Sequence, residues 1–314
     1  MFFCHNKSVF QTKDGGKMAD GSMLKKAIIS GTAQIRKHYE SVDAINVFPV
    51  PDGDTGTNLS LTLGGCAEAL ENYENTSAHE TADFIAGELL KCARGNSGVI
   101  FSLIFGGFAK SIEGLDEIDA LSLAKGLERG CEEAYAAIDK PTEGTMLTVI
   151  RLAASKAVCA AEKGATTEQT FIAAVEGAKA ALKSTRNLLP ILKKRGIVDA
   201  GAQGLVYIME GMAGVSSAEK EAVQSQSESE NFNSDFTYCT EFIITRNGTG
   251  SVADIRSFLG EIGDCPAAAE HSGIIKIHVH TNSPHLALQK GLEYGELSKI
   301  KIDNMRLQSI ASGK

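Results

Sequence analysis

Two aspartates that flank a single glycine form the chemically most suggestive stretch of this sequence. Asp52 and Asp54 follow Pro49 and Pro51, which disfavour a regular helix, so both carboxylates can turn toward one point in a tight loop around Gly53. Carboxylate oxygens suit a hard cation such as Mg²⁺. The alternative is an acidic turn whose aspartates only cap the helix that follows.

The residues after this loop are suited to bind phosphate. The run over residues 59–70 predicts a helix, and the backbone N–H groups of its first turn have no partners within the helix. These groups would lie beside the two acids. The sequence therefore predicts a site in which Asp52 and Asp54 hold magnesium and the next residues hold phosphate, namely Thr55, Gly56, Thr57 and Asn58.

Three other polar loops that contain glycine lead into predicted helices, at residues 94–98, 140–146 and 196–204. Alternate helices of an up-down bundle begin at the same end, so these loops can converge on one nucleotide. Taken singly, each loop is explained as well by helix capping, a turn or core packing. The candidate contacts are Asn96 and Ser97 for phosphate, Thr145 and Met146 beside the base, and Asp199 and Gly201 at the ribose.

The composition is that of a globular protein and excludes several classes. Of the 314 residues 43% are hydrophobic and 22% charged, and the net charge of −8 argues against a non-specific binder of nucleic acid. The sequence has neither a signal peptide nor an apolar stretch of the roughly 18 to 20 residues that a membrane span needs. We expect a cytoplasmic protein. The seven cysteines, an odd number without a Cys-x-x-Cys pair, favour reduced thiols.

The helical elements that must position these loops are predicted from apolar spacing. After a loose leader at residues 1–20, apolar positions recur every three, four and seven residues from Ser22 onward, which indicates an amphipathic helix. Residues 21–215 are therefore predicted to form an all-α bundle of eight helices. After the first helix, which ends near Val42, these helices cover roughly 57–74, 79–93, 97–111, 118–138, 145–162, 167–184 and 202–213.

A second, smaller domain follows a linker that is rich in Ser, Glu and Gln at residues 216–235. In residues 236–314 the pattern changes to strands and helices in the order β-α-β-β-α-β, which is typical of a ferredoxin-like α+β domain. The third element is poor strand material because it contains Cys265-Pro-Ala-Ala-Ala269. The expected ranges are 236–246, 252–262, 266–270, 274–281, 284–294 and 298–303.

The small domain offers a second candidate metal site. His278 and His280 lie two residues apart and so share one face of a strand, and Cys239 lies in another predicted strand. One cysteine and two histidines suit Zn²⁺. Ordinary packing of a buried cysteine and a histidine pair is the alternative, and three ligands leave the fourth position open.

Three motifs of the helical domain resemble a known family. The segments 46–58, 93–98 and 198–201 are similar to the nucleotide-binding domain of the dihydroxyacetone-kinase L-subunit type, and in particular to fatty acid kinase A subunits. The segments 238–242, 277–281 and 294–306 resemble the middle domain of the same subunits. The resemblance covers nearly the whole chain.

This resemblance implies an eight-helix domain that binds ATP through two magnesium ions. Asp52 and Asp54 would be metal ligands, and the third would be Asn46, with Asp43 as the alternative. The middle domain would bind zinc through Cys239, His278 and His280, with His271 or Glu241 as candidates for the fourth ligand. The γ-phosphoryl group would pass to a fatty-acid carboxylate on a separate carrier protein, giving an acyl phosphate. A homodimer is also expected.

Fatty acid kinase A subunits continue into a domain that docks the carrier, whereas this chain stops at Lys314, so a truncated form is expected. A nucleotide-binding regulatory module without kinase activity, or a glycerone-type kinase, is therefore an alternative. A phosphatase with an Asp-x-Asp-x-Thr loop fits less well, because Gly56 stands where the threonine belongs. An EF-hand calcium loop fits worse still, since Thr57 and Leu63 replace the required Gly and Glu.

Overall fold

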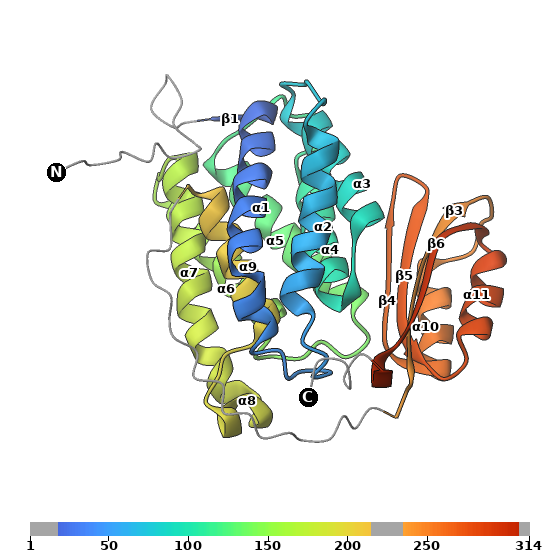
Figure 1. Cartoon of the computed structure of the whole chain (residues 1–314). Helices are drawn as coiled ribbons and strands as arrows, with labels where there is room; N and C mark the ends of the chain where they lie inside the picture. The colour runs from blue at the N-terminus through green and yellow to red at the C-terminus, as the bar shows by residue number, and fades with distance from the viewer. Residues whose placement is uncertain (1–17, 215–234, 308–314) are drawn as a thin grey trace.

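The computed structural model describes residues 18–214 and 235–307, and within them it shows a helical domain followed by a small domain built on a β-sheet (Figure 1). This confirms the predicted fold class. Most of the expected leader and almost all of the expected linker lie outside the described residues. None of the described helices is long and apolar enough to cross a membrane.

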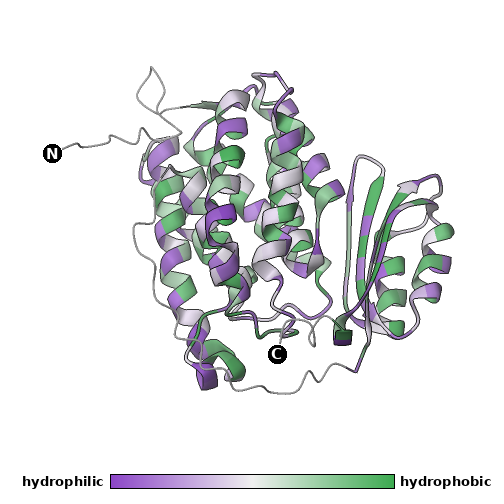
Figure 2. Ribbon diagram, viewed as in Figure 1, coloured by the Kyte–Doolittle hydropathy of each residue, from purple (hydrophilic) through white to green (hydrophobic). Residues whose placement is uncertain are grey.

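The helical domain has nine helices in its described part, one more than predicted. Hydrophobic and hydrophilic residues alternate along them, as an amphipathic bundle requires (Figure 2). The helices are α1 (Gly21–Asp43), α2 (Thr55–Leu70), α3 (Ala78–Cys92), α4 (Gly95–Ser111), α5 (Ala120–Ala137), α6 (Met146–Glu162), α7 (Thr167–Leu188), α8 (Pro190–Arg195) and α9 (Ala200–Met212).

The prediction missed three short elements of this domain. Helix α8 has six residues, too few to show a period, and it begins at Pro190 and ends at Gly196, whose φ is 67°. Strands β1 (Ala19–Asp20) and β2 (Glu117–Ile118) pair with each other in antiparallel fashion and have two residues each. The end of the expected leader is therefore ordered.

The small domain has the predicted β-α-β-β-α-β order, and its four strands are antiparallel in the spatial order β4-β5-β3-β6. This is the ferredoxin-like topology, in which each strand-helix-strand unit leaves room for a strand between its two strands. The elements are β3 (Tyr238–Arg246), α10 (Val252–Ile262), β4 (Gly263–His271), β5 (Ile274–Thr281), α11 (Pro284–Leu292) and β6 (Gly295–Asn304).

The two faces of this sheet differ in character. Phe242 and Ile277 belong to the apolar set that packs with Leu259 of α10 and Ala287 of α11. The opposite face lies toward the helical domain (Figure 1), and two rows of polar residues cross its strands there. One row is His278, Glu241 and Lys301, and the other is Asp264, His280, Cys239 and Asp303.

Strand β4 lies against the helical domain, which explains its unusual composition. Ala267 and Ala269 form an apolar cluster with Leu90, Ala93 and Val99 of the α3–α4 region. Small side chains let the strand backbone approach the helices, and Ala267 also makes a β-bridge with Ile138 beyond α5. The weak strand propensity of this segment is thus offset by its packing.

A buried carboxylate also joins the two domains. Glu241 is 2% exposed, and it accepts hydrogen bonds from the backbone N–H of Gly95 at 2.6 Å and from Lys276 Nζ at 3.2 Å. Its Oε1 lies 3.1 Å from Nδ1 of His278. Burial opposes ionisation, but the hydrogen bond with His278 and the charge of Lys276 hold the pKa of Glu241 well below its usual range.

Two adjacent glycines of α4 test the close packing of this helix on α5. A Cβ at Gly107 would lie 2.6 Å from the carbonyl oxygen of Arg129, whereas a Cβ at Gly106 would meet nothing within 4 Å. We expect Gly107→Ala to destabilise the protein by about 1–3 kcal/mol through overpacking. Gly106→Ala, the matched control, should be neutral or stabilise it by up to about 1 kcal/mol. Urea unfolding measures both, and equal effects would contradict this packing.

Replacing Glu241 tests the buried ion pair that it forms with Lys276 inside the small domain. Glu241→Gln leaves Lys276, which is also 2% exposed, without its counter-charge, so we expect a loss of about 3–5 kcal/mol at neutral pH. Because folding lowers the pKa of Glu241, this stabilisation is present above about pH 4.3 and is lost as the pH falls further.

The control for this pair is Glu293→Gln, which breaks an ion pair with Lys290 on α11, where the Glu293 side chain is 58% exposed. That change should cost less than about 1 kcal/mol. Similar losses for the two variants in denaturant unfolding would show that Glu241 does not act as a buried ion-pair partner.

Candidate functional site

The polar face of the sheet and the Asp52–Asp54 loop enclose one small cavity of about 50 Å³, here called the acidic cavity. By volume it has room for roughly three to five water molecules. The helical domain contributes Asp52, Asp54, Thr55, Asn58, Asn96 and Ser97 to its lining, among other residues. The small domain contributes Cys239, Glu241, His278, His280, Lys301 and Asp303. The two predicted metal sites thus face each other.

The two aspartates of the loop form a pair of like charges. Burial, followed by the charge of Asp54, raises the pKa of Asp52 to about 8. Burial also raises the pKa of Asp54. Two such carboxylates are ionised together only when a cation compensates them. The donor set of the cavity therefore fits a hard divalent ion such as Mg²⁺.

Asn46, the expected third metal ligand, holds the loop in shape. Its Nδ2 donates to Oδ1 of Asp52 at 2.6 Å and to the carbonyl oxygen of Val50 at 3.1 Å, and its Oδ1 accepts from the hydroxyl of Thr55 at 2.7 Å. It is only 2% exposed, although it still lines the acidic cavity. In this arrangement Asn46 contacts a predicted ligand and fixes its orientation.

Asp43, the alternative ligand, caps helix α2. Its carboxylate accepts hydrogen bonds from the backbone N–H groups of Gly56 at 2.6 Å and Thr57 at 3.1 Å, and from the Thr57 hydroxyl at 2.6 Å. These three donors were expected to hold phosphate. The structure instead gives them a carboxylate partner, and neither Gly56 nor Thr57 lines the acidic cavity.

Gly56 has a packing role that the sequence did not show. A Cβ there would lie 2.2 Å from the carbonyl oxygen of Tyr39 in α1, so only glycine allows the two helices this close. Thr55 and Asn58, by contrast, line the acidic cavity.

A larger cavity of about 340 Å³ adjoins the first and shares Pro49, Thr55, Asn96 and Ser97 with it. Its volume lies in the range of small-molecule sites. The beginnings of four helices line this larger cavity, which confirms the expected convergence of the four loops. The residues that they supply are Thr55 of α2, Asn96 and Ser97 of α4, Thr145 and Met146 at α6, and Asp199 and Gly201 at α9.

Two of these residues also cap their helices. The hydroxyl of Thr145 accepts from the backbone N–H of Leu147 at 3.3 Å, and Asp199 accepts from that of Ala202 at 2.8 Å. Asp199 is 4% exposed, and burial raises its pKa to about 7. Capping and ligand contact are thus compatible here, because each side chain lines the cavity while it holds the helix start.

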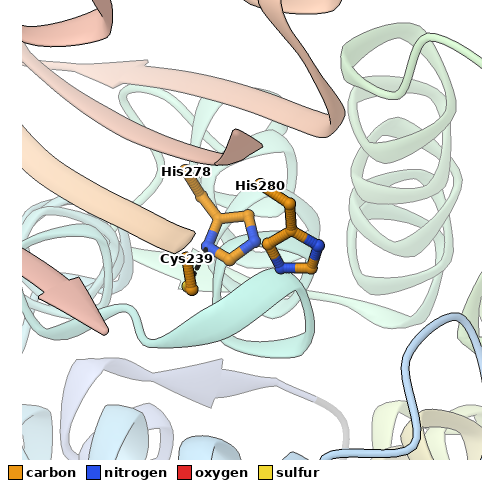
Figure 3. A group of neighbouring side chains, drawn as sticks. All are labelled: Cys239, His278 and His280. Atoms are coloured by element: carbon orange, nitrogen blue, oxygen red, sulfur yellow. Dashed lines mark hydrogen bonds between the residues drawn. The ribbon is translucent and has the colours of Figure 1, made fainter. Parts of the chain in front are cut away.

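Cys239, His278 and His280 lie together on the polar face of the sheet (Figure 3). Their ligand atoms are all within 4.8 Å of one another, and the Cys239 sulfur lies 3.8 Å from Nδ1 of His278. In the described part of the chain, Nε2 of His278 and Nδ1 of His280 are buried without a hydrogen-bond partner. Such unpartnered nitrogens beside a thiol fit Zn²⁺.

The two candidates for a fourth zinc ligand lie elsewhere. The Nε2 atom of His271 lies 3.0 Å from a carboxylate oxygen of Asp83 in α3, so His271 is not part of this cluster. Glu241 lies behind His278 and bonds to its Nδ1, the position from which a carboxylate orients a metal-binding imidazole. Asp264 stands in a similar place beside His280, with Oδ1 3.3 Å from Nδ1, although the two are not aligned for a hydrogen bond.

Several residues of the site were missed by sequence reasoning. Asp264, Cys265 and His280 form a second group of possible metal ligands, which shares its histidine with the first. Lys301 and Asp303 line the acidic cavity from β6. Their spacing of two residues, the same as that of His278 and His280, was the available signal, because it places both side chains on one face of a strand.

Comparison with known proteins agrees with this division of the chain. Residues 49–214 match the DAK2 domain family, and residues 235–312 match the middle domain of proteins like the fatty acid kinase A subunits. The dihydroxyacetone kinase of C. freundii, in a crystal structure of its native form, overlays on 68% of this chain and 36% of its own with a TM-score of 0.46 and 18% identity.

Two curated relatives extend the similarity across both domains. Protein YloV of Bacillus subtilis is 37% identical over 311 residues, and an uncharacterized protein of Staphylococcus saprophyticus is 38% identical over 309 residues. Each alignment covers 92% of this chain but 56% of the relative, so the chain spans a little over half of their length. With more than half of its residues inside the DAK2 match, the chain belongs to the DAK2 family, in the form that carries the middle domain of fatty acid kinase A subunits.

Proposed function

We propose that this chain binds ATP with magnesium between its two domains and transfers the γ-phosphoryl group to a fatty-acid carboxylate. The observation that carries the proposal is the convergence of four helix starts on one cavity that opens beside the Asp52 and Asp54 pair. Family membership supports a kinase-type phosphotransferase. A carboxylate acceptor is already ionised near neutral pH, so no general base is required.

The roles of the residues follow from their positions. Asp52 and Asp54 would hold two magnesium ions, with Asn46 fixing Asp52. Bound magnesium would neutralise charge on the β- and γ-phosphates. Thr55, Asn58, Asn96 and Ser97 would hold phosphate oxygens. Residues of the larger cavity would surround the ribose and base, namely Thr145, Met146, Asp199 and Gly201.

We also propose that the small domain binds zinc through Cys239, His278 and His280. The unpartnered imidazole nitrogens support this assignment, and Glu241 would orient His278. The carrier protein that presents the fatty acid, and assembly as a homodimer, are proposals that rest on the family. A cytoplasmic location is an expectation of the same kind.

A nucleotide-binding regulatory module is the second candidate, because the helix starts that line the larger cavity could hold a nucleotide without transferring its phosphate. A phosphatase fits less well, since the nucleophilic aspartate of that class ends a strand and residues 44–54 contain none. An assay with labelled ATP and a fatty acid loaded on a carrier protein distinguishes the two hypotheses. A kinase transfers the labelled phosphate to the fatty acid, whereas a regulatory module does not.

The double variant Asp52→Asn/Asp54→Asn tests the magnesium site. We expect it to lose at least about tenfold in affinity for Mg-ADP, roughly 1.4 kcal/mol, because the metal ligands are gone. Its melting temperature without nucleotide should stay the same or rise, since two crowded acids are removed. Calorimetry and thermal melting measure the two effects.

The control is Asp254→Asn, which removes an exposed carboxylate from the first turn of α10. It should bind Mg-ADP as the parent does. Tight binding of Mg-ADP by the double variant would rule out the metal site.

Elemental analysis of the purified chain tests the zinc site. We expect about one zinc per chain, a clear loss of zinc in Cys239→Ser, and a lower melting temperature for that variant because metal binding is coupled to folding. Cys159→Ser, at an exposed free cysteine, is the matched control and should keep its metal. A parent protein without zinc, or equal zinc in both variants, would contradict the assignment.

A further inference from the structure

Lys301 is a cation that the small domain contributes to the lining of the acidic cavity. Its side chain is 42% exposed, and it shares the cavity with Asp52, Asp54 and Ser97. The same cavity holds the proposed metal ligands and phosphate contacts. A positive side chain therefore stands at the place where the proposed function puts the most negative charge.

The sheet fixes the direction of this lysine. Lys301 lies opposite Glu241 in the pairing of β6 with β3, on the polar face that covers the helical domain. The carboxylate of Asp303, two residues further along the same face, pairs with Lys301 Nζ. Lys301 also shares the lining of the acidic cavity with Asp54 across the domain boundary. Lys301 is thus positioned beside the loop by Asp303 on its own strand and by the pairing of β6 with β3.

The two cavities define which part of a nucleotide can reach Lys301. Thr145, Met146 and Asp199 line the larger cavity, and Lys301 does not. Asn96 and Ser97 line both cavities. A nucleotide with its base and ribose in the larger cavity extends its phosphates past Asn96 and Ser97, so the phosphate farthest from the ribose enters the acidic cavity.

A surface ion pair is the simpler explanation of Lys301 and Asp303. Such a pair contributes at most about 1 kcal/mol to stability, and it does not require a cavity. Here both partners line the cavity, and they lie beside the paired aspartates of the other domain. An ammonium group is a compact charge with three donors, which suits the oxygens of a terminal phosphate.

We propose that Lys301 binds the terminal phosphate of the nucleoside triphosphate, so that the small domain completes the phosphate site of the helical domain. This inference rests on the proposed function, because it assumes a nucleotide in the larger cavity. It adds a substrate contact from the second domain. The lysine would distinguish a triphosphate from a diphosphate.

Calorimetry of the full chain with Mg²⁺ tests the assignment, with ADP and the β,γ-methylene analogue of ATP as ligands. In Lys301→Met we expect about a tenfold loss of affinity for the triphosphate analogue and less than about a twofold change for ADP. Lys301→Arg keeps the charge and should retain much of the preference for the triphosphate. Lys290→Met, which removes an ion-paired lysine on α11, should match the parent.

Removing Lys301 also leaves Asp303 without its partner, so Lys301→Met/Asp303→Asn is a necessary companion variant. If Lys301→Met loses affinity for both nucleotides and the double variant regains it, the loss comes from the unpaired Asp303. That result would overturn the proposal that Lys301 contacts the phosphate. An unchanged ratio of triphosphate to diphosphate affinity in Lys301→Met would overturn it as well. If the parent binds neither nucleotide, the proposed function fails together with this assignment, whereas an unchanged ratio defeats the assignment alone.

Discussion

The geometry of the site depends on the hydrogen bonds of one buried carboxylate, that of Glu241. This carboxylate is buried between the domains and forms hydrogen bonds with groups from both. The helical domain supplies the backbone N–H of Gly95, and the small domain supplies Lys276 and His278. An unpaired charge in such a place costs several kcal/mol, so the partners must be in position together. The start of α4 and the polar face of the sheet are thereby held in a fixed relative position.

This constraint explains why the site is divided between two domains. The helical domain supplies acids and helix starts, and the small domain supplies a thiol, imidazoles and a lysine. The ferredoxin-like sheet buries one face under α10 and α11 and leaves the other for polar residues. Those residues are covered by the helical domain instead of solvent. Neither domain alone encloses the acidic cavity.

A sequence pattern reveals contacts between residues that are close together in the chain. The Asp52-Gly53-Asp54 loop was visible because its residues are adjacent. Thr145 and Asp199 were singled out as nucleotide contacts because they lie in polar loops that lead directly into helices. The role of Asp43 was not visible, since it caps a helix that starts a dozen residues later. Sequence spacing cannot show that the end of α1 turns back onto the start of α2. The donors on Gly56 and Thr57 were assigned to phosphate for that reason.

The small domain shows the same limit for residues that lie farther apart in the sequence. The alternation of His278 and His280 indicated that both face one side of a strand, and the β-α-β-β-α-β order of elements indicated a ferredoxin-like domain. Strand register and domain packing decide which other side chains lie on that face. They place Lys301 and Asp303 in the acidic cavity and His271 against Asp83. The sequence by itself determined the elements, their order and the local loops, because these depend on neighbouring residues. Only the tertiary structure decided the assembly of the site, because its contacts join residues far apart in the sequence, such as Gly95 and Glu241, which are 146 residues apart.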